Sequence, residues 1–307
     1  MILAGDIGGT NCRYAIFDGQ NLSHIRVWPT SQSTGIAYDL ERYQHEVGVS
    51  IHPTRACVAI AGPVSGSEVS LTNADWNGSI ADFPCPAIWV NDLVAAIQGL
   101  DLAEAEHIAG PKAIDKHAHR VALGVGTGFG QALRIGDQAF AGEGGHASFA
   151  PTSQKQHELY SFLRNRKTRV RVEDVCSGMG MENILDFLLE QSGTVIERKT
   201  SAGAMFGTAT DSFLLQGLDI FLSSLGSVIG DTAIRQLPHG GIWLCGGVAK
   251  KMKPHYIRAS FQEALQQKEP MNRQVASIPI FVVLEEELGL IGAGRIAYEG
   301  LCGFEHN

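Results

Sequence analysis

The sequence predicts an α/β fold made of two domains, and three observations lead to this prediction. The chain has 307 residues, which at about 100–200 residues per domain suggests two domains or one large one. Short apolar runs that look like strands alternate with helix-like segments and often end at glycines. A pattern of strand, glycine-rich turn and returning strand occurs twice, at 2–17 and 120–135. Two related halves, each with such a turn, would clasp one nucleotide in the cleft between them.

Hydrophobic periodicity and turn residues predict the elements in order. Strands are expected at 2–6, 12–17, 22–28, 55–61, 88–90, 120–125, 131–135, 241–245 and 278–284. Helices are expected at 35–48, 93–100, 155–165, 178–191, about 203–236 and 292–298. The polar stretch 101–119 is expected to cross between domains, and the last helix to pack back on the first domain. The predicted small domain is therefore 1–101 plus 288–307, and the predicted large domain is 102–287.

Composition excludes several classes of protein. Hydrophobic residues make up 44% and charged residues 18% of the chain, so it can bury a sizeable core and is not disordered. The net charge of -8 disfavours a nucleic-acid partner, which needs a basic face. No run is expected to reach the ~20 apolar residues of a membrane helix, and no signal peptide is recognised. The six scattered cysteines indicate free thiols in a reducing cytoplasm.

The first glycine-rich turn is a candidate phosphate site. Asp6 ends an apolar strand and is followed by Gly8, Gly9, Thr10 and Asn11. Glycines let several backbone N–H groups point at one anion, and the Thr and Asn side chains add donors. A carboxylate at a strand end can hold Mg²⁺, usually through water. The alternative is an ordinary hairpin with an exposed Asp; a Walker loop is excluded because no Gly-Lys-Ser/Thr follows.

Two further glycine sites follow strands in the second half. Gly126, Thr127 and Gly128 form the tip of the second turn, which by itself could be a plain β-turn. Gly246 and Gly247 follow the strand at 241–245 and could simply let a helix pack on that strand. In a fold that clasps a nucleotide, they would face the adenosine.

Asn91 and Asp92 stand between a strand and a helix. An Asp at this place can be the N-cap of the helix. It can also be a general base, because a sugar hydroxyl is a poor nucleophile and a carboxylate can take its proton as the phosphoryl group arrives. Both interpretations are open on the sequence.

A third group of polar residues suits a ligand rich in hydroxyl groups. Glu143 and His146 lie among glycines, and Glu173 lies in the segment 172–178. Carboxylate and imidazole supply acceptors and a donor on a backbone that a ligand can approach closely. The alternatives are a surface turn for the first two residues and a first-turn helix acid for Glu173. No Cys/His cluster supports zinc.

Together these motifs resemble bacterial-type glucokinase, in the sugar kinase/Hsp70/actin superfamily with its ribonuclease H-like fold. The matching stretches run in order over almost the whole chain: 5–13, 59–64, 71–76, 90–93, 124–130, 142–151, 171–178 and 246–248. The resemblance implies ATP and Mg²⁺ as the phosphoryl donor system, glucose as the acceptor, an active site in the cleft between the domains, and a homodimer. It implies that Asp92 is the catalytic base and that Asn91, Glu143, His146 and Glu173 bind hydroxyl groups. Asn73 and Gly62 would line the sugar pocket. The first turn would face the terminal phosphates, and the second turn the inner phosphates.

Departures from the family and rival functions remain. The zinc-binding Cys cluster of related repressor-type kinases is absent, which favours glucokinase proper. Glu285, Glu286 and Glu287 are unlike the usual family ending, and their role stays open. The first rival is a kinase of another hexose, such as mannose, fructose or an N-acetyl amino sugar. The others are a sugar-binding regulator, which would normally carry an N-terminal DNA-binding segment, and an ATP-driven protein like actin or Hsp70, where 142–146 would have no purpose.

Overall fold

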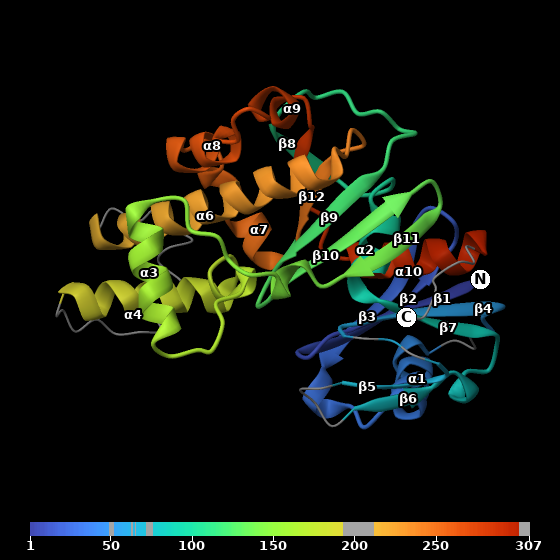
Figure 1. Ribbon diagram of the computed structural model, residues 1–307. Helices are drawn as coiled ribbons and strands as arrows, with labels where there is room; N and C mark the ends of the chain where they lie inside the picture. Colours follow the sequence, from blue (N-terminus) through green and yellow to red (C-terminus); the bar gives the residue numbers. More distant parts are fainter. Residues whose placement is uncertain (49–51, 63, 65, 72–75, 193–211, 301–307) are drawn as a thin grey trace. The chain divides into compact units, whose positions relative to one another are not determined.

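The computed structural model describes residues 1–48, 52–62, 64, 66–71, 76–192 and 212–300 (Figure 1). The chain divides into two compact units. Unit 1 comprises Met1–Glu104, Ala132–Ala141 and Glu285–Asn307, and unit 2 comprises Ala105–Gln131 and Gly142–Leu284. The domain boundaries expected from the sequence stay a prediction. A unit that is compact need not be a domain, since a domain must also fold independently.

Unit 1 is built on a five-stranded sheet in the order β3-β2-β1-β4-β7. The strands are β1 (Ile2–Ile7), β2 (Asn11–Phe17), β3 (Leu22–Pro29), β4 (Arg55–Ile60) and β7 (Ala87–Asn91). A small two-stranded sheet of β5 (Glu68–Ser70) and β6 (Asn77–Ser79) accompanies it. β1, β4 and β7 are parallel, with Ile7 opposite Ile60 and Ile60 opposite Asn91. The carboxyl ends of these three strands therefore meet at one edge, where ligands commonly bind in α/β sheets.

Among the described residues, the α-helices of this unit are α1 (Ile36–Val47), α2 (Asp92–Gly99) and α10 (Leu288–Glu299). α10 packs on α2 and on β1, as expected for the terminal helix, although it starts four residues before the predicted Gly292. A Cβ atom on Gly292 would lie 1.7 Å from the carbonyl oxygen of Ala95, and one on Gly99 would lie 2.8 Å from that of Leu288. Glycine is required at this crossing because the two helix backbones are in direct contact.

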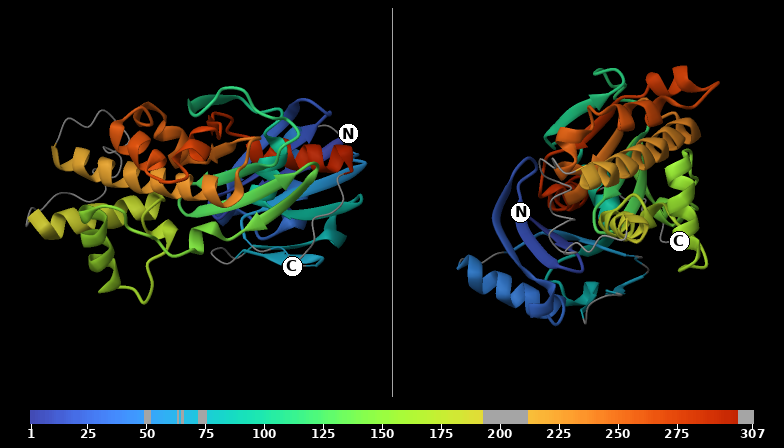
Figure 2. Two further views of the ribbon diagram at one scale, coloured as in Figure 1. Left: turned by 45° about the horizontal axis from the view of Figure 1, so that its top comes forward. Right: turned by 90° about the vertical axis from the view of Figure 1, so that its left-hand side faces the viewer.

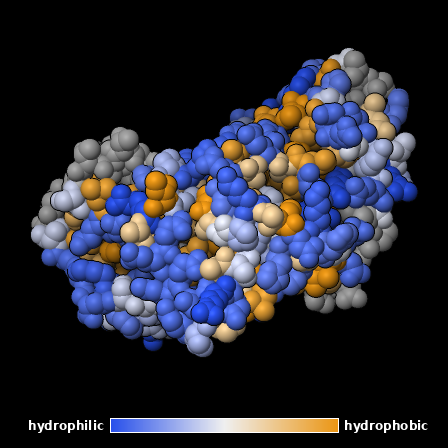
Figure 3. Space-filling model, turned by 90° about the horizontal axis from the view of Figure 1, so that it is seen from above, coloured by the Kyte–Doolittle hydropathy of each residue, from blue (hydrophilic) through white to orange (hydrophobic). Residues whose placement is uncertain are grey.

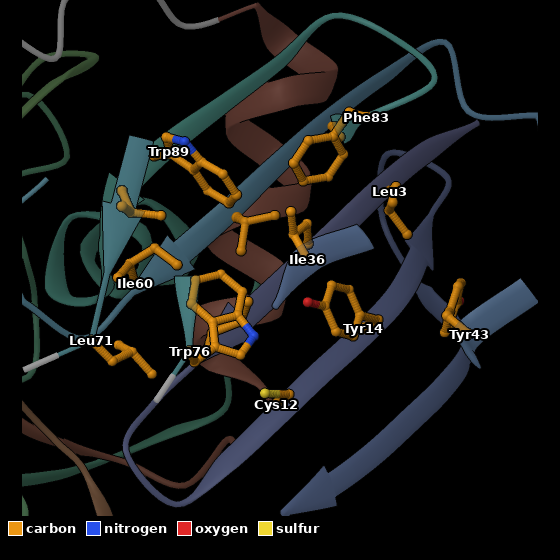
Figure 4. Packing of buried hydrophobic residues seen from close by; sticks show 14 of the residues in the cluster. Leu3, Cys12, Tyr14, Ile36, Tyr43, Ile60, Leu71, Trp76, Phe83 and Trp89 are labelled. Carbon is orange, nitrogen blue, oxygen red and sulfur yellow. The ribbon is translucent and has the colours of Figure 1, made fainter. Parts of the chain in front are cut away.

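The core of unit 1 includes the aromatic side chains of Tyr14, Trp76 and Trp89 (Figure 4), and a buried carboxylate contacts two of them. Asp39 on α1 is fully buried and accepts hydrogen bonds from the Tyr14 hydroxyl at 2.9 Å and from the indole N–H groups of Trp28 and Trp76, each at 3.0 Å. Burial, with the Asp39 charge in second place, raises the pKa of Tyr14 well above its ordinary value. These bonds join α1, β2 and β3 to the chain at Trp76, so one carboxylate fixes four segments.

Unit 2 contains most of a six-stranded sheet in the order β11-β10-β9-β12-β13-β8. Its strands are β8 (Ala105–Ala109), β9 (Arg120–Val125), β10 (Phe129–Ile135), β11 (Gln138–Gly142), β12 (Ile242–Cys245) and β13 (Ile280–Val283). β9, β12 and β13 are parallel, and β8 is antiparallel to β13. β8 lies within 101–119, the stretch expected to cross between domains, and the sequence did not predict a strand there. Its residues are mostly half-buried and do not alternate clearly between polar and apolar, so hydrophobic periodicity did not predict this edge strand.

Within the part of unit 2 that the structure describes, the α-helices are α3 (Gln154–Arg164), α4 (Gly178–Ser192), α6 (Ser212–Gln236), α7 (Gly247–Lys251), α8 (Ala259–Gln266) and α9 (Asn272–Ala276). α6 runs between α8 and α9 on one side and α3 and α4 on the other (Figure 2). It is long and apolar enough to cross a membrane, with a mean hydropathy of 1.5, so the expectation that no run reaches this length was wrong. Because 61% of that window is buried inside the protein, α6 is the core helix of this unit.

In the face shown by Figure 3, hydrophilic residues cover most of the area and apolar residues form smaller areas between them. On α6 itself, the buried positions include Leu218, Phe221, Leu225 and Ile229, which follow the three- and four-residue spacing of a helix face. The apolar length of α6 is therefore explained by packing against neighbouring helices.

Candidate functional site

The carboxyl edge of the parallel strands in unit 1 gathers three of the predicted motifs. β1 leads into Gly8 and Gly9, β4 into Gly62, and β7 into Asp92. Gly62 has a φ of 141°, a backbone conformation that favours glycine. The side-chain amide of Asn91 donates to the carbonyl oxygen of Gly62 at 3.3 Å. The structure therefore brings together, within this unit, residues predicted separately from three strands.

Asn91, and not Asp92, is the N-cap of α2. Its side-chain oxygen accepts from the backbone N–H groups of Leu93 at 3.0 Å and Val94 at 3.3 Å. Asp92 is the first residue of the helix, and its carboxylate also accepts from Leu93 N–H at 2.9 Å. The capping alternative for Asp92 is thus wrong, because its neighbour has that role. Asn91 therefore uses its side-chain oxygen and one amide N–H in fixing this turn.

The first glycine-rich turn is fixed mainly by Thr30, which stands in the turn after β3. The Thr30 hydroxyl donates to the carbonyl oxygen of Gly8 at 2.6 Å, and its backbone N–H donates to Thr10 at 2.9 Å. The turn is closed by the bond from Gly8 N–H to Asn11 at 3.0 Å. A Cβ atom on Gly9 would meet no atom within 4 Å. The backbone at Gly9 is therefore open to a ligand from that side.

Asp6 lies beside this turn and next to the first turn of α10. The Arg13 guanidinium donates to its carboxylate at 3.4 Å. A Cβ atom on Gly289 would lie 2.9 Å from that carboxylate. Burial raises the pKa of Asp6, and the charge of Arg13 opposes the rise. Glu287 precedes α10, and burial together with Glu285 raises its pKa as well, against the same arginine.

In unit 2, the second and third glycine sites adjoin each other. β9 and β12 are parallel with Gly124 opposite Cys245, so their carboxyl ends share an edge. Gly246 has a φ of 97°, and a Cβ atom there would lie 2.7 Å from the carbonyl oxygen of Val125. A Cβ atom on Gly247 would meet no atom within 4 Å. Only glycine fits at 246, whereas Gly247 opens a free space beside it.

The N-terminus of α4 supports the second turn. The backbone N–H of Gly178 donates to Gly126 at 2.8 Å, and that of Met179 donates to Thr127 at 3.3 Å. Within the turn, the Gly126 N–H donates to Gly128 at 3.0 Å. These N–H groups of α4 are used by the turn, so the helix end fixes the turn and is not itself the anion site.

Three of the predicted hydroxyl-binding residues, Glu143, His146 and Glu173, come together in unit 2. His146 Nε2 lies 3.7 Å from Glu143 Oε2, and His146 Nδ1 lies 3.8 Å from Glu173 Oε1. Glu143 and His146 have largely exposed side chains, while that of Glu173 is 11% exposed. A Cβ atom on Gly145 would lie 1.8 Å from the carbonyl oxygen of Phe129, so the loop can approach β10 only with glycine there. Two carboxylates therefore flank one imidazole.

This cluster touches the second glycine-rich turn. A Cβ atom on Gly128 would lie 3.1 Å from Glu173 Oε2. Glu173 lies in the short 3-10 helix Val172–Asp174, and its backbone oxygen accepts from the hydroxyl of Ser177, just before α4, at 2.6 Å. A turn predicted to hold phosphate and a cluster predicted to hold hydroxyl groups are thus neighbours in unit 2.

Sequence reasoning missed the residues that surround Glu173. Arg171 contacts Glu173 Oε1 at 2.5 Å, and Lys167 donates to Asp174 at 2.7 Å. A signal for them was present: residues 164–171 carry five basic side chains in a chain of net charge -8. A basic run is usually a solvated face, but here Arg171 at its end contacts the predicted ligand residue Glu173.

Comparison with known proteins gives the family. The family model described as Glucokinase matches residues 3–299. The chain is 31% identical to a glucokinase of Nostoc sp., over 97% of this chain and 98% of that one. The chain belongs to the glucokinase family. A crystal structure of glucokinase from an Antarctic psychrotroph superimposes with a TM-score of 0.84 at 26% identity, covering 97% of this chain and 98% of that one.

More distant glucokinases support the fold. A ROK-family glucokinase from Streptomyces griseus, solved with glucose and AMPPNP, has a TM-score of 0.67 at 18% identity, covering 97% of this chain and 99% of that chain. The two-domain sugar kinase/Hsp70/actin-like fold expected from the sequence is confirmed. The roles of the individual site residues stay predictions. Asn73, expected in the sugar pocket of this glucokinase-family chain, lies outside the described residues.

Proposed function

We propose that this chain transfers the γ-phosphoryl group of ATP to the 6-hydroxyl of glucose, giving glucose 6-phosphate for glycolysis. The observation that carries the proposal is the contact in unit 2 between the Gly128 turn and the cluster of Glu143, His146 and Glu173. A turn that exposes backbone to phosphate, beside carboxylates and an imidazole that bind hydroxyl groups, suits a phosphoryl donor and a sugar acceptor. Membership of the glucokinase family supports the same reaction.

In the proposed mechanism, Asp92 accepts the proton of the 6-hydroxyl. The hydroxyl oxygen bonds to the γ-phosphorus, the bond from that phosphorus to the bridging oxygen breaks, and ADP leaves. Asn91 fixes Asp92 by capping α2, so the carboxylate is presented at the strand edge. Asn91, Glu143, His146 and Glu173 bind hydroxyl groups and orient the ring. Because the transition state is loose, orientation contributes as much as basicity.

The nucleotide is proposed to bind at the glycine sites. Gly8, Gly9, Thr10 and Asn11 would face the terminal phosphates, Gly126, Thr127 and Gly128 the inner phosphates, and Gly246 and Gly247 the adenosine. The open backbone at Gly9 and Gly247 supports this assignment, since a ligand could approach both.

Magnesium is part of the proposal, and its donor set can be tested against the structure. Among the described residues, no group of three or more His, Cys, Asp or Glu side chains is arranged to hold a metal ion. Mg²⁺ typically uses one or two carboxylates together with water and substrate phosphates, so a single carboxylate at Asp6 fits. When bound, the ion would neutralise charge on the phosphates.

We further propose a cytoplasmic homodimer, on family resemblance alone.

The experiment is a sugar panel with the purified chain, ATP and Mg²⁺. A site built around hydroxyl ligands rejects analogues that lack or misplace them. We expect kcat/KM for glucose to exceed that for fructose, mannose and N-acetylglucosamine by a wide margin. Comparable turnover of fructose would refute the glucose assignment and leave the kinase assignment. No phosphorylation of any hexose would refute both.

A further inference from the structure

A cation next to the proposed sugar ligands has no role in the function described so far. Arg171 belongs to the basic run 164–171 and lies between His146, Glu173 and Asp174. Its contacts are specific in direction as well as distance, because a guanidinium is a planar group that only donates hydrogen bonds. The inference that follows rests on the proposed function.

Asp174 anchors Arg171 in one orientation. The Arg171 Nε and Nη2 groups donate to the two oxygens of Asp174 at 3.2 and 3.0 Å, and the Arg171 backbone N–H donates at 2.8 Å. The Asp174 side chain is 1% exposed, and Lys167 also donates to it. Burial acts to raise the pKa of Asp174, but the hydrogen bonds from Arg171 and Lys167 lower that pKa overall. The anchor is therefore an ionised, bidentate pair.

The remaining nitrogen of Arg171 points at two proposed sugar ligands. Arg171 Nη1 lies 2.5 Å from Glu173 Oε1 and 3.2 Å from His146 Nδ1. Since the guanidinium can only donate, His146 Nδ1 must accept and carries no proton. The neutral imidazole then has its proton on Nε2, the nitrogen that faces Glu143. The same Nη1 occupies one oxygen of Glu173 and leaves the other next to Gly128.

We propose that Arg171 is a positioning residue of the sugar site. It fixes the Nε2–H tautomer of His146, which presents that ring as a hydrogen-bond donor, and it orients the carboxylate of Glu173 as an acceptor. A hydroxyl group both donates and accepts, so a fixed donor beside a fixed acceptor defines how the hydroxyl must lie. Arg171 thereby acts on the sugar through other residues.

The backbone around His146 is supported independently of Arg171. Val172 N–H donates to Ala147 at 2.9 Å, and Phe149 N–H donates to Val170 at 3.1 Å. Arg169 Nη2 donates to the carbonyl oxygen of His146 at 2.7 Å. Removal of the Arg171 side chain is therefore expected to free the ring and the Glu173 carboxylate while the loop stays in place.

The kinetic test compares Arg171→Met and Arg171→Lys with Arg166→Met. Arg166 belongs to the same basic run but pairs with Glu190. Arg166→Met therefore removes the same charge as Arg171→Met without removing a contact to His146 or Glu173. We expect both Arg171 variants to lower kcat/KM for glucose by about 10- to 100-fold, the scale for partners that orient ligand-holding side chains. The KM for ATP should change much less. Arg171→Lys should not restore kcat/KM, because one ammonium group cannot make the several directed hydrogen bonds of the guanidinium.

A glucose KM near the wild-type value in folded Arg171→Met would overturn the proposal. So would an equal rise in the KM values for glucose and ATP, which would indicate a general structural role. Arg166→Met should behave as wild type.

The spectroscopic test measures the tautomer without turnover. In ¹⁵N NMR of the full chain, the signal of His146, identified by its loss in His146→Gln, should show an unprotonated Nδ1. That signal should move in Arg171→Met and stay in Arg166→Met. A protonated Nδ1 in the wild type would overturn the proposal. If the wild type phosphorylates no glucose, the proposed function fails, and this measurement alone decides whether Arg171 fixes the tautomer.

Discussion

The two glycine-rich turns share one sequence pattern but are supported in different ways. The first turn, after β1, is fixed by a side chain, through the hydroxyl of Thr30 on Gly8. The second turn, after β9, is fixed by the backbone of a helix, through the N–H groups of Gly178 and Met179. Both arrangements use the carbonyl groups of the turn and leave glycine positions, Gly9 and Gly126, with open space beside them.

The carboxylates near the turns differ as well. Asp6 beside the first turn is paired with Arg13 and contacts the start of α10. Glu173 beside the second turn contacts Gly128 and belongs to the cluster of proposed sugar ligands. A repeated turn thus marks two places where phosphate could bind, but the neighbouring side chains decide what else each place does. The following predictions test this division of roles, starting with the largest effect.

Asp92→Asn tests whether Asp92, which lies at the same sheet edge as the first glycine-rich turn, is the catalytic base. The substitution keeps the shape and the N-cap at Asn91 but removes the proton acceptor, so kcat should fall by about 10²–10⁴-fold. Steady-state kinetics and calorimetric glucose binding on the folded variant separate two causes. Near-normal glucose affinity supports the base, and a large loss of affinity supports a positioning role. A variant with near wild-type kcat would end the assignment.

Asp6→Asn should affect activity and stability in opposite directions. If Asp6 helps to hold Mg²⁺, activity should fall by about 10- to 100-fold. Because burial raises the pKa of Asp6, its contribution to stability is fully present below the unfolded-state value of 3.8 and is lost as the pH rises through the higher folded-state value.

The wild type without ligands should therefore lose part of its stability as the pH rises above about 4, and Asp6→Asn should not lose that part. Urea denaturation of both proteins across pH 4–8 measures this difference. If both proteins show the same dependence of unfolding free energy on pH, burial does not raise the pKa of Asp6. If Asp6→Asn keeps its full Mg²⁺-dependent activity, Asp6 is not part of the proposed Mg²⁺ site.

Gly126→Val and Gly128→Val form a matched pair in the second turn. Both should raise the KM for ATP, because a side chain would keep phosphate from the backbone. Only Gly128→Val should also weaken glucose binding, by about 10-fold, since a Cβ atom there meets the Glu173 carboxylate at 3.1 Å whereas one at Gly126 meets nothing within 4 Å. Equal effects of the two variants on glucose affinity, measured by calorimetry, would contradict the link between this turn and the sugar cluster.

Much of the chain could be predicted because its signals are local. Buried strands such as 55–60 are short continuous apolar runs, and glycines after them indicate turns that need an open backbone. The motifs at 5–13, 90–93 and 142–146 indicated the family, because residue types and their spacing within a motif can be read directly from the sequence. The edge strand β8 escaped prediction because a half-buried edge strand has little periodicity.

The sequence by itself determined the fold class, the family and the set of candidate site residues. Only the tertiary structure decided which atoms those residues use. It assigned the N-cap to Asn91 instead of Asp92, placed Gly128 against Glu173, and brought Arg171 between His146 and Glu173. The physical reason is that hydrogen bonds depend on distance and direction over a few ångströms. Those are set by how distant segments pack, and no pattern along the chain contains them.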